Sequence, residues 1–97
     1  MIIICFTEYP VQHSMEVTMR YLELPRLPEY ITGKGNYVYS TNEKGYHSIS
    51  IFKVDDKKVK KAFDAITKAC LTFIDIPGYQ YEIRMCHTAK EGIKLLA

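Results

Sequence analysis

Apolar residues along this 97-residue chain change their spacing several times, and each spacing predicts a different element. Residues 2–7 form a short apolar run rich in β-branched side chains, which favours a buried central strand over a helix. From residue 11 to residue 24 the apolar spacing becomes three or four, which predicts one face of a helix. The apolar positions of this helix are Val11, Met15, Met19 and Leu22. Pro25 and Pro28 end it, because proline does not continue a helix.

The middle of the chain predicts a β-hairpin. Residues 33–36, with two glycines, are expected to form a loop that leads into a strand over residues 37–41. Residues 46–54 predict a second strand. Residues 42–45 carry turn-forming side chains, and Gly45 can adopt the positive φ that a tight turn requires.

The clearest helical stripe of the chain follows this hairpin. Asp55 or Asp56 is expected to cap the helix by accepting hydrogen bonds from amides of its first turn. The apolar positions of the stripe fall three and four residues apart, at Val59, Ala62, Phe63, Ile66, Cys70 and Phe73. Residues 76–78, Ile-Pro-Gly, predict the turn that comes next.

The end of the chain predicts one more strand and a short helix. Apolar and polar residues alternate over residues 81–86, which is typical of a half-buried strand. Thr88 and Glu91 match the capping box, in which each side chain satisfies a backbone amide at a helix start. We therefore expect a terminal helix over residues 89–97.

The predicted element order is β-α-β-β-α-β followed by a short helix, within a single domain spanning residues 1–97. Right-handed crossovers on either side of a hairpin give a four-stranded antiparallel sheet with both helices on one face. This α+β pattern resembles the ferredoxin-like α/β plait over essentially the whole chain. The resemblance rests on element order and implies the strand order 4-1-3-2.

Strand alternation predicts which side chains face the helices and which lie on the open face of the sheet. We expect Ile2, Ile4, Phe6, Ile49, Ile51, Tyr81, Ile83 and Met85 to face the helices. The open face is then expected to carry Ile3, Cys5, Thr7, Tyr46, Ser48, Ser50, Phe52, Glu82, Arg84 and Cys86. Such a mixture of apolar, aromatic and polar groups is expected to be covered by a partner or a ligand.

An open face of this kind resembles that of the dimeric α+β barrel group of ferredoxin-like proteins, in which two sheets close face to face. The resemblance implies a homodimer through the open face, and a small-molecule-binding or interaction module. The candidate residues for the ligand or the dimer contact are Cys5, Thr7, Tyr46, Ser48, Ser50, Phe52, Glu82 and Arg84. Some members of the group are oxygenases or isomerases, which leaves a small barrel enzyme as the alternative.

For that enzyme, Arg84 is the candidate to hold a carboxylate or phosphate through its planar guanidinium group. Glu82 is the candidate base, provided that burial raises its pKa. His47 or His13 is a further candidate base. An exposed ion pair between Glu82 and Arg84 without catalytic function is the simpler interpretation.

Charge argues against a nucleic-acid partner. The formal net charge is only +2, so no strong field attracts anionic polymers. Residues 44–51 share part of the third-strand signature of the RNA-recognition motif, but Ser48 stands where a base-stacking aromatic is needed. An RNA-binding module is therefore the least favoured of the three functions.

The three cysteines, Cys5, Cys70 and Cys86, are an odd number without CxxC spacing, which favours reduced thiols and a cytoplasmic location. No signal peptide or membrane span is expected, because the apolar segment at the start of the chain, residues 1–6, is only six residues long. Cys70 is predicted to lie in the core. Cys5 and Cys86 are expected to be small buried residues, with a redox pair or soft metal site as the alternative. We expect no resident metal or cofactor.

Overall fold

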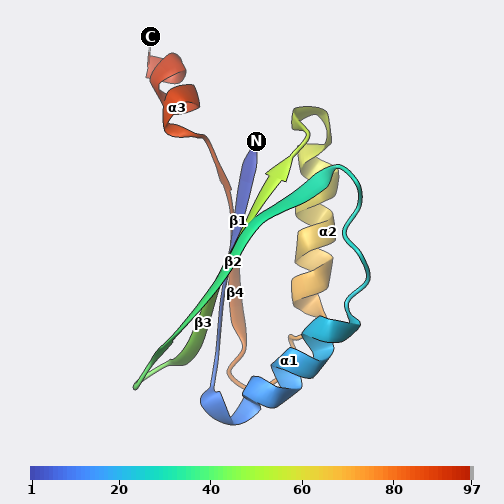
Figure 1. The fold of residues 1–97 in the computed structure, drawn as a ribbon, viewed down its shortest axis with the longest axis vertical. Coiled ribbons are helices and arrows are strands. Elements are labelled where there is room, and N and C mark those ends of the chain that lie inside the picture. The colour runs from blue at the N-terminus through green and yellow to red at the C-terminus, as the bar shows by residue number, and fades with distance from the viewer. Residues whose placement is uncertain (97) are drawn as a thin grey trace.

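The computed structural model describes residues 1–96 and consists of a layer of helices packed on a four-stranded sheet (Figure 1). The strands are β1 (Ile2–Tyr9), β2 (Ile31–Thr41), β3 (Gly45–Val54) and β4 (Gln80–Cys86). The helices are α1 (Ser14–Glu23), α2 (Val59–Leu71) and α3 (Ala89–Leu96). All neighbouring strands pair antiparallel in the order β2-β3-β1-β4, which confirms the predicted α+β plait. The last residue of the predicted terminal helix, Ala97, lies outside the described residues.

Strand β2 begins earlier than the sequence predicts, and the expected loop over residues 33–36 is wrong. Gly33, Gly35 and Asn36 pair with β3, and Lys34 lies in a bulge between Gly33 and Gly35. A Cβ at Gly35 would lie only 2.7 Å from the ring of Tyr37, so this glycine leaves room for the aromatic ring to lie along its own strand. Gly35 is therefore a position where the Tyr37 side chain comes close to the backbone, and the pairing between β2 and β3 continues past it.

The predicted turn is confirmed, and the predicted caps are found in part: Lys58 at the start of α2 has no side-chain cap, and Asp55 caps the 3-10 turn ahead of it. Gly45 has φ of 79°, and a Cβ there would lie 2.5 Å from the carbonyl oxygen of Tyr9. The Asp55 carboxylate accepts a 3.0 Å hydrogen bond from the amide of Lys57 at the start of a short 3-10 helix before α2. The Thr88 hydroxyl accepts the amide of Glu91, which is one half of the capping box, and it donates to the Glu91 carboxylate.

The main core lies between α2 and the sheet. Ala62, Ile66 and Cys70 of α2 are buried there, as predicted. They pack against Ile3 and Cys5 of β1. The partly buried members of this cluster include Phe52, Val59, Phe63, Tyr81 and Ile83.

The predicted orientation of β1 and β3 is wrong. Ile3 and Cys5 are 0% and 5% exposed beneath α2, so the odd-numbered residues of β1 face the helices. Register then assigns the facing residues of β3 to the same side: Ser50 pairs with Cys5, and Phe52 pairs with Ile3. The orientation of β4 is as predicted at Tyr81 and Ile83, which join the core.

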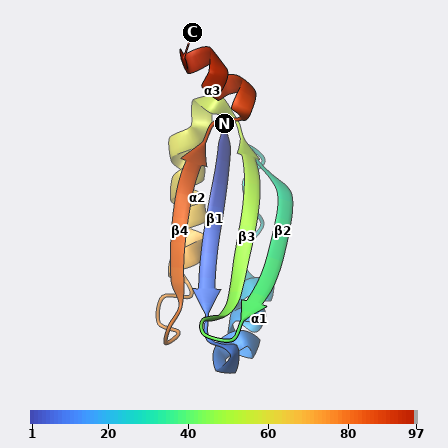
Figure 2. The same cartoon turned by 90° about the vertical axis from the view of Figure 1, so that its left-hand side faces the viewer.

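As a consequence, the open face carries a different set of residues from the predicted one. Viewed from that side, the four strands run side by side with α1 and α2 behind them (Figure 2). The open-face residues are Ile2, Ile4, Phe6 and Glu8 of β1, His47, Ile49, Ile51 and Lys53 of β3, Tyr37 and Tyr39 of β2, and Glu82, Arg84 and Cys86 of β4. The prediction failed because both faces of β1 and β3 carry apolar residues, so hydrophobicity alone does not orient these strands.

Helix α1 also turns a different side to the core from the predicted one. The stripe of Val11, Met15, Met19 and Leu22 is more than half exposed at each position. The buried residue of α1 is Val17, which packs with Phe73, Ile76 and Tyr79 in a second cluster at the end of the sheet. Because α1 contacts the rest of the fold at this end, one residue rather than a full stripe is enclosed.

Helix α3 does not cover the open face. Figures 1 and 2 both show it beyond the end of the sheet at which the N-terminus lies. Its residues Ile93, Leu95 and Leu96 are 68%, 68% and 89% exposed. Over residues 1–96, none of the helices is both long and apolar enough to cross a membrane.

Candidate functional site

The eight predicted site residues do not lie on one surface. Cys5, Thr7, Ser48, Ser50 and Phe52 face the helices and line a cleft between the sheet and the helix layer. Tyr46 is on the same side of the sheet, with its ring 5.8 Å from that of Tyr9. Glu82 and Arg84 alone are on the open face, as predicted. The two groups are therefore separated by the thickness of the sheet.

The cleft has a volume of about 980 Å³. Its floor is the helix-facing side of β1 and β3, and its walls are α1, α2, β2 and the connection over residues 24–28. The apolar side chains among its lining include Val17, Leu22, Leu24, Leu27, Val38 and Ile66. Clefts that bind small organic molecules have volumes of roughly 300–1,000 Å³ and mostly apolar walls.

A row of polar side chains crosses the floor of this cleft. The hydroxyls of Thr7 and Ser48 hydrogen-bond to each other. The hydroxyl of Ser50 donates to the amide oxygen of Asn36 at 3.3 Å, and the Asn36 amide nitrogen donates to the Tyr21 hydroxyl at 3.3 Å. The floor thus offers both donors and acceptors in an otherwise apolar setting, the arrangement that orients a bound molecule.

The charged residues of the cleft are both cationic. Arg26 of the connection and Lys68 of α2 line it, and its lining contains no aspartate or glutamate. Within the described part of the chain, neither cation lies within 4 Å of a carboxylate. The cleft therefore favours an anionic group over a cationic one.

Two thiols meet in the floor of the cleft. The Sγ atoms of Cys5 and Cys70 lie 3.4 Å apart, and both residues are 5% exposed. The hydrogen bond with Cys5 lowers the pKa of the Cys70 thiol, burial opposes this shift, and a hydrogen bond with Tyr79 lowers the pKa further. The hydrogen bond with Cys70, together with burial, raises the pKa of Cys5. Burial and the neighbouring thiols raise the pKa of Tyr79, so its hydroxyl stays protonated beside Cys70.

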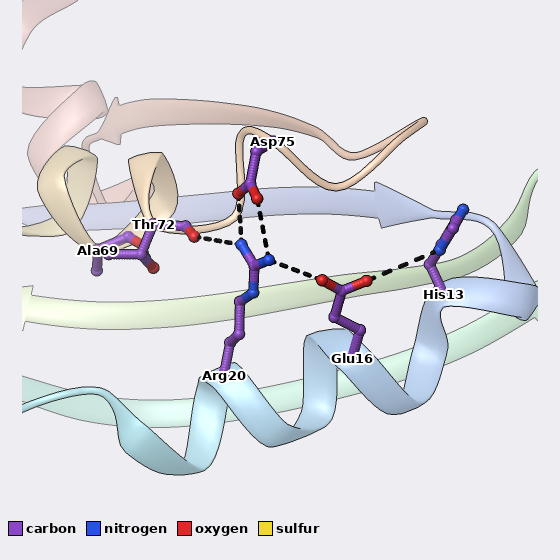
Figure 3. A network of polar contacts seen from close by, with 6 residues as sticks. All are labelled: His13, Glu16, Arg20, Ala69, Thr72 and Asp75. Atoms are coloured by element: carbon purple, nitrogen blue, oxygen red, sulfur yellow. Dashed lines mark hydrogen bonds and ion pairs between the residues drawn. The ribbon is translucent and has the colours of Figure 1, made fainter.

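An ion-pair network fixes α1 at one end of the cleft (Figure 3). Arg20 of α1 binds Asp75 through both guanidinium nitrogens and donates to the Thr72 carbonyl at 2.9 Å. Its second partner is Glu16, 2.7 Å away, which also approaches His13 at 3.9 Å. The bidentate geometry joins α1 to the segment after α2, and so holds two walls of the cleft together.

The open face combines a central apolar band with polar groups at its borders. The band consists of Ile4 and Phe6 of β1 beside Ile51 and Ile49 of β3. Tyr37 and Tyr39 extend it across β2 and are 59% and 52% exposed. All four residues of the band are only half-buried by their own neighbours.

The candidate acid–base residues lie at the border of this band. Glu82 and Arg84 form an exposed 2.8 Å ion pair, with the Arg84 guanidinium 5.7 Å from the centre of the Phe6 ring. His47 lies 3.6 Å from the carboxylate of Glu8, and the ring of Tyr39 stacks on it at 4.8 Å. Glu8, His47 and Glu82 line a shallow depression of about 420 Å³. In residues 1–96, no group of three or more His, Cys, Asp or Glu converges closely enough to hold a metal ion.

Several residues of the cleft could not be predicted from the sequence. The sequence predicts a loop at Asn36 and indicates no role for Tyr21, Arg26 and Lys68. Cys5 and Cys86, which the sequence predicts on one face of the sheet, lie on opposite faces, and the neighbour of Cys5 is Cys70. The buried stripe of the second predicted helix did carry a signal for Cys70, but no sequence feature indicated which strand residue it would meet.

No protein-family model matches the chain, and no curated protein sequence matches it. A formyltetrahydrofolate deformylase from Pseudomonas putida KT2440 aligns with a TM-score of 0.46 and 14% identity, over 88% of this chain and 28% of the deformylase chain. A DUF3240 family protein from Shewanella baltica OS155 aligns with a TM-score of 0.37 and 16% identity, over 90% of this chain and 91% of that chain. The chain spans little more than a quarter of the deformylase. Both likenesses concern the fold, and neither bears on what this chain binds.

Proposed function

We propose that this ferredoxin-like domain is a small-molecule-binding module whose ligand is an amphipathic anion seated in the cleft between the sheet and α1 and α2. The observation that carries the proposal is the composition of that cleft: apolar walls, a polar row on the floor, and two cations without an acidic residue. A ligand with an apolar body and one carboxylate, phosphate or sulfate group complements all three features.

The cleft is open above the sheet because the side chains of the polar row on its floor are small. Thr7, Ser48 and Ser50 are small, so they leave space above the sheet where a core would normally hold leucine or isoleucine. Their hydroxyls already have protein partners, which satisfies them when the cleft holds only water. A bound polar group can share these hydroxyls, because each one both donates and accepts.

Calorimetric titration with dodecanoate tests this proposal, with dodecanol as the uncharged probe. We expect dodecanoate to bind more tightly than dodecanol, and Lys68→Ala or Arg26→Ala to weaken dodecanoate binding by roughly tenfold, a loss of about 1.4 kcal/mol. Arg84→Ala is the matched control, because it removes a cation from the opposite face. Equal binding of both probes, or equal weakening by Arg84→Ala, would contradict an anion site in the cleft.

A second candidate function, assembly as a homodimer through the open face, is favoured by the apolar band of that face. The face of β1 is about 26 Å long for eight residues, and four strands are about 19 Å wide, so the sheet offers roughly 500 Å² per partner. A stable interface needs about 800 Å² per partner. Exposed Ile93, Leu95 and Leu96 of α3 are the apolar residues available to supply the remainder.

Light scattering on a sizing column tests the dimer. We expect a particle of twice the 11.3 kDa chain mass that becomes monomeric in Ile49→Glu. Val38→Glu is the matched control, because Val38 lies on β2 but faces the cleft. A monomer at all concentrations, or a dimer that persists in Ile49→Glu, would refute this interface.

The barrel-enzyme alternative depends on the same dimer. Closure of two open faces would enclose Glu82, Arg84 and His47, which the single chain leaves at the border of the band. A monomer in the light-scattering experiment would therefore contradict the barrel-enzyme alternative as well.

A further inference from the structure

The contact between Cys5 and Cys70 joins two segments that are far apart along the chain. Cys5 lies on β1 and Cys70 near the end of α2, 65 residues later, yet their Sγ atoms are 3.4 Å apart. Both are free thiols, and both line the cleft. Small residues bring α2 close to the sheet here, since Ala62, Ala65 and Ala69 lie along the same side of the helix.

We propose that Cys5 and Cys70 form a redox-active dithiol, whose two-electron oxidation creates a disulfide between β1 and α2 in the floor of the cleft. A disulfide has an S–S length of about 2.05 Å, so the sulfur atoms need to approach by about 1.4 Å. The cysteine side chains already point toward each other, which leaves small side-chain rotations and a slight shift of α2 to close the bond.

The environment of the pair assigns a role to each thiol. The 3.4 Å contact with Cys5 and a hydrogen bond with Tyr79 lower the pKa of Cys70, so we assign Cys70 as the nucleophile. Cys5 retains its proton until the second step and is the resolving thiol. Both thiols border the cleft, which is the route that the proposal requires for a small hydroperoxide to reach them.

The reaction balances with one hydroperoxide as the oxidant. The Cys70 thiolate attacks the peroxide oxygen, the O–O bond breaks, and Cys70 becomes a sulfenic acid while the leaving oxygen takes up a proton to form water or an alcohol. The Cys5 sulfur then attacks the sulfenic sulfur, the S–O bond breaks, and the departing hydroxyl leaves as water with the Cys5 proton. Two thiols are oxidised to one disulfide, and the peroxide is reduced.

The third cysteine provides the internal comparison. Cys86 is on the open face, opposite Ile2 of β1, and its sulfur lies 3.9 Å from the carbonyl oxygen of Arg84. The sheet lies between Cys86 and the other two thiols, so an intramolecular bond to Cys86 is excluded by its orientation. Oxidation at Cys86 can therefore yield only a sulfur acid or a bond between two chains.

The experiment uses the full chain with Cys86→Ser, which leaves Cys5 and Cys70 unchanged. After treatment with hydrogen peroxide, we expect titratable thiols under denaturing conditions to fall from two to zero, with the mass of one chain reduced by two hydrogen atoms. Peptide mapping should join the peptides of Cys5 and Cys70, and dithiothreitol should restore both thiols. The oxidised chain should melt about 5 °C or more higher, because the bond closes a long loop.

Cys5→Ser and Cys70→Ser in the same background are the controls, and neither should give an intramolecular product. Cys5→Ser should accumulate a sulfenic acid at Cys70, whereas Cys70→Ser should leave Cys5 largely unreacted. Retention of both thiols, gain of oxygen atoms on both sulfurs, or only disulfides between chains would overturn the proposal. The mapped product of the unsubstituted pair decides the question even if a serine variant fails to fold.

Discussion

The orientation of β1 predicts opposite consequences for two neighbouring isoleucines. Ile3 is fully buried beneath α2, whereas Ile4 is half-buried on the open face beside Ile51. Truncation of a buried isoleucine to alanine costs about 2–5 kcal/mol, the higher values applying where the surroundings cannot collapse. Because Ile3 packs in the core cluster with Ala62 and Ile66, we expect Ile3→Ala to lower the free energy of unfolding by about 3–4 kcal/mol.

Ile4→Ala removes the same atoms from a site that keeps its water contacts. We expect a loss of about 1 kcal/mol in dilute solution, because only part of the apolar area is buried. A domain of this size is stable by about 5–15 kcal/mol, so both variants should remain folded at 25 °C. Ile3→Val, with an expected cost of about 0.5–1.5 kcal/mol, provides a milder second measurement at the core position.

Urea unfolding followed by circular dichroism measures these differences. Equal m-values in the three variants would indicate that the midpoint differences report stability. If the open face forms a dimer, the cost of Ile4→Ala should grow with protein concentration, while that of Ile3→Ala should not. A larger cost for Ile4→Ala than for Ile3→Ala in dilute solution would refute the assigned orientation of β1.

Three further outcomes follow from local geometry. Gly45→Ala should destabilise the fold by more than about 1 kcal/mol, because the φ of Gly45 is positive and a Cβ there would contact the Tyr9 carbonyl. Gly33→Ala is the control in the same unfolding assay, and it should have a small effect because the space around Gly33 is open. Arg20 lowers the pKa of Asp75, so this pair stabilises the fold fully above the unfolded pKa of about 3.9, and its contribution is lost as the pH falls below that value. Asp75→Asn should therefore make the free energy of unfolding depend less on pH on the acid side. An unchanged pH dependence would contradict the pairing. Tyr79→Phe should raise the pH midpoint for alkylation of Cys70, since a hydrogen bond that favours the thiolate is lost, and Tyr39→Phe on the open face should leave the midpoint unchanged.

The element order could be predicted because each element carries its own local signal. The turn at Gly45, the capping box at Thr88 and the stripe of α2 depend on residues close together in sequence, and all three were recognised. The loop expected around Gly35 failed for a tertiary reason, since the glycine accommodates the Tyr37 ring. That contact is not visible in a pattern that treats glycine as a breaker.

The faces of the central strands could not be predicted, because this sheet reverses the usual distribution of polarity. Its helix-facing side carries Thr7, Ser48 and Ser50, while its open side carries the isoleucine-rich apolar band. Periodicity places the more apolar side in the core, and this sheet breaks that rule because small polar side chains lie beneath the helices and isoleucines lie on its open side. The same reversal is the physical basis of both proposed functions.

The most direct test of the proposed cleft is a titration of the ¹⁵N-labelled protein with dodecanoate, followed through its amide chemical shifts. We expect saturable shifts at Asn36, Ser48, Ser50 and Ala69, which line the cleft. Ile49→Glu, examined in parallel, should bind in the same way because Ile49 points to the other side of the sheet. Shifts confined to the open face, around Ile4 and Ile51, or an absence of shifts at saturating dodecanoate would contradict the account.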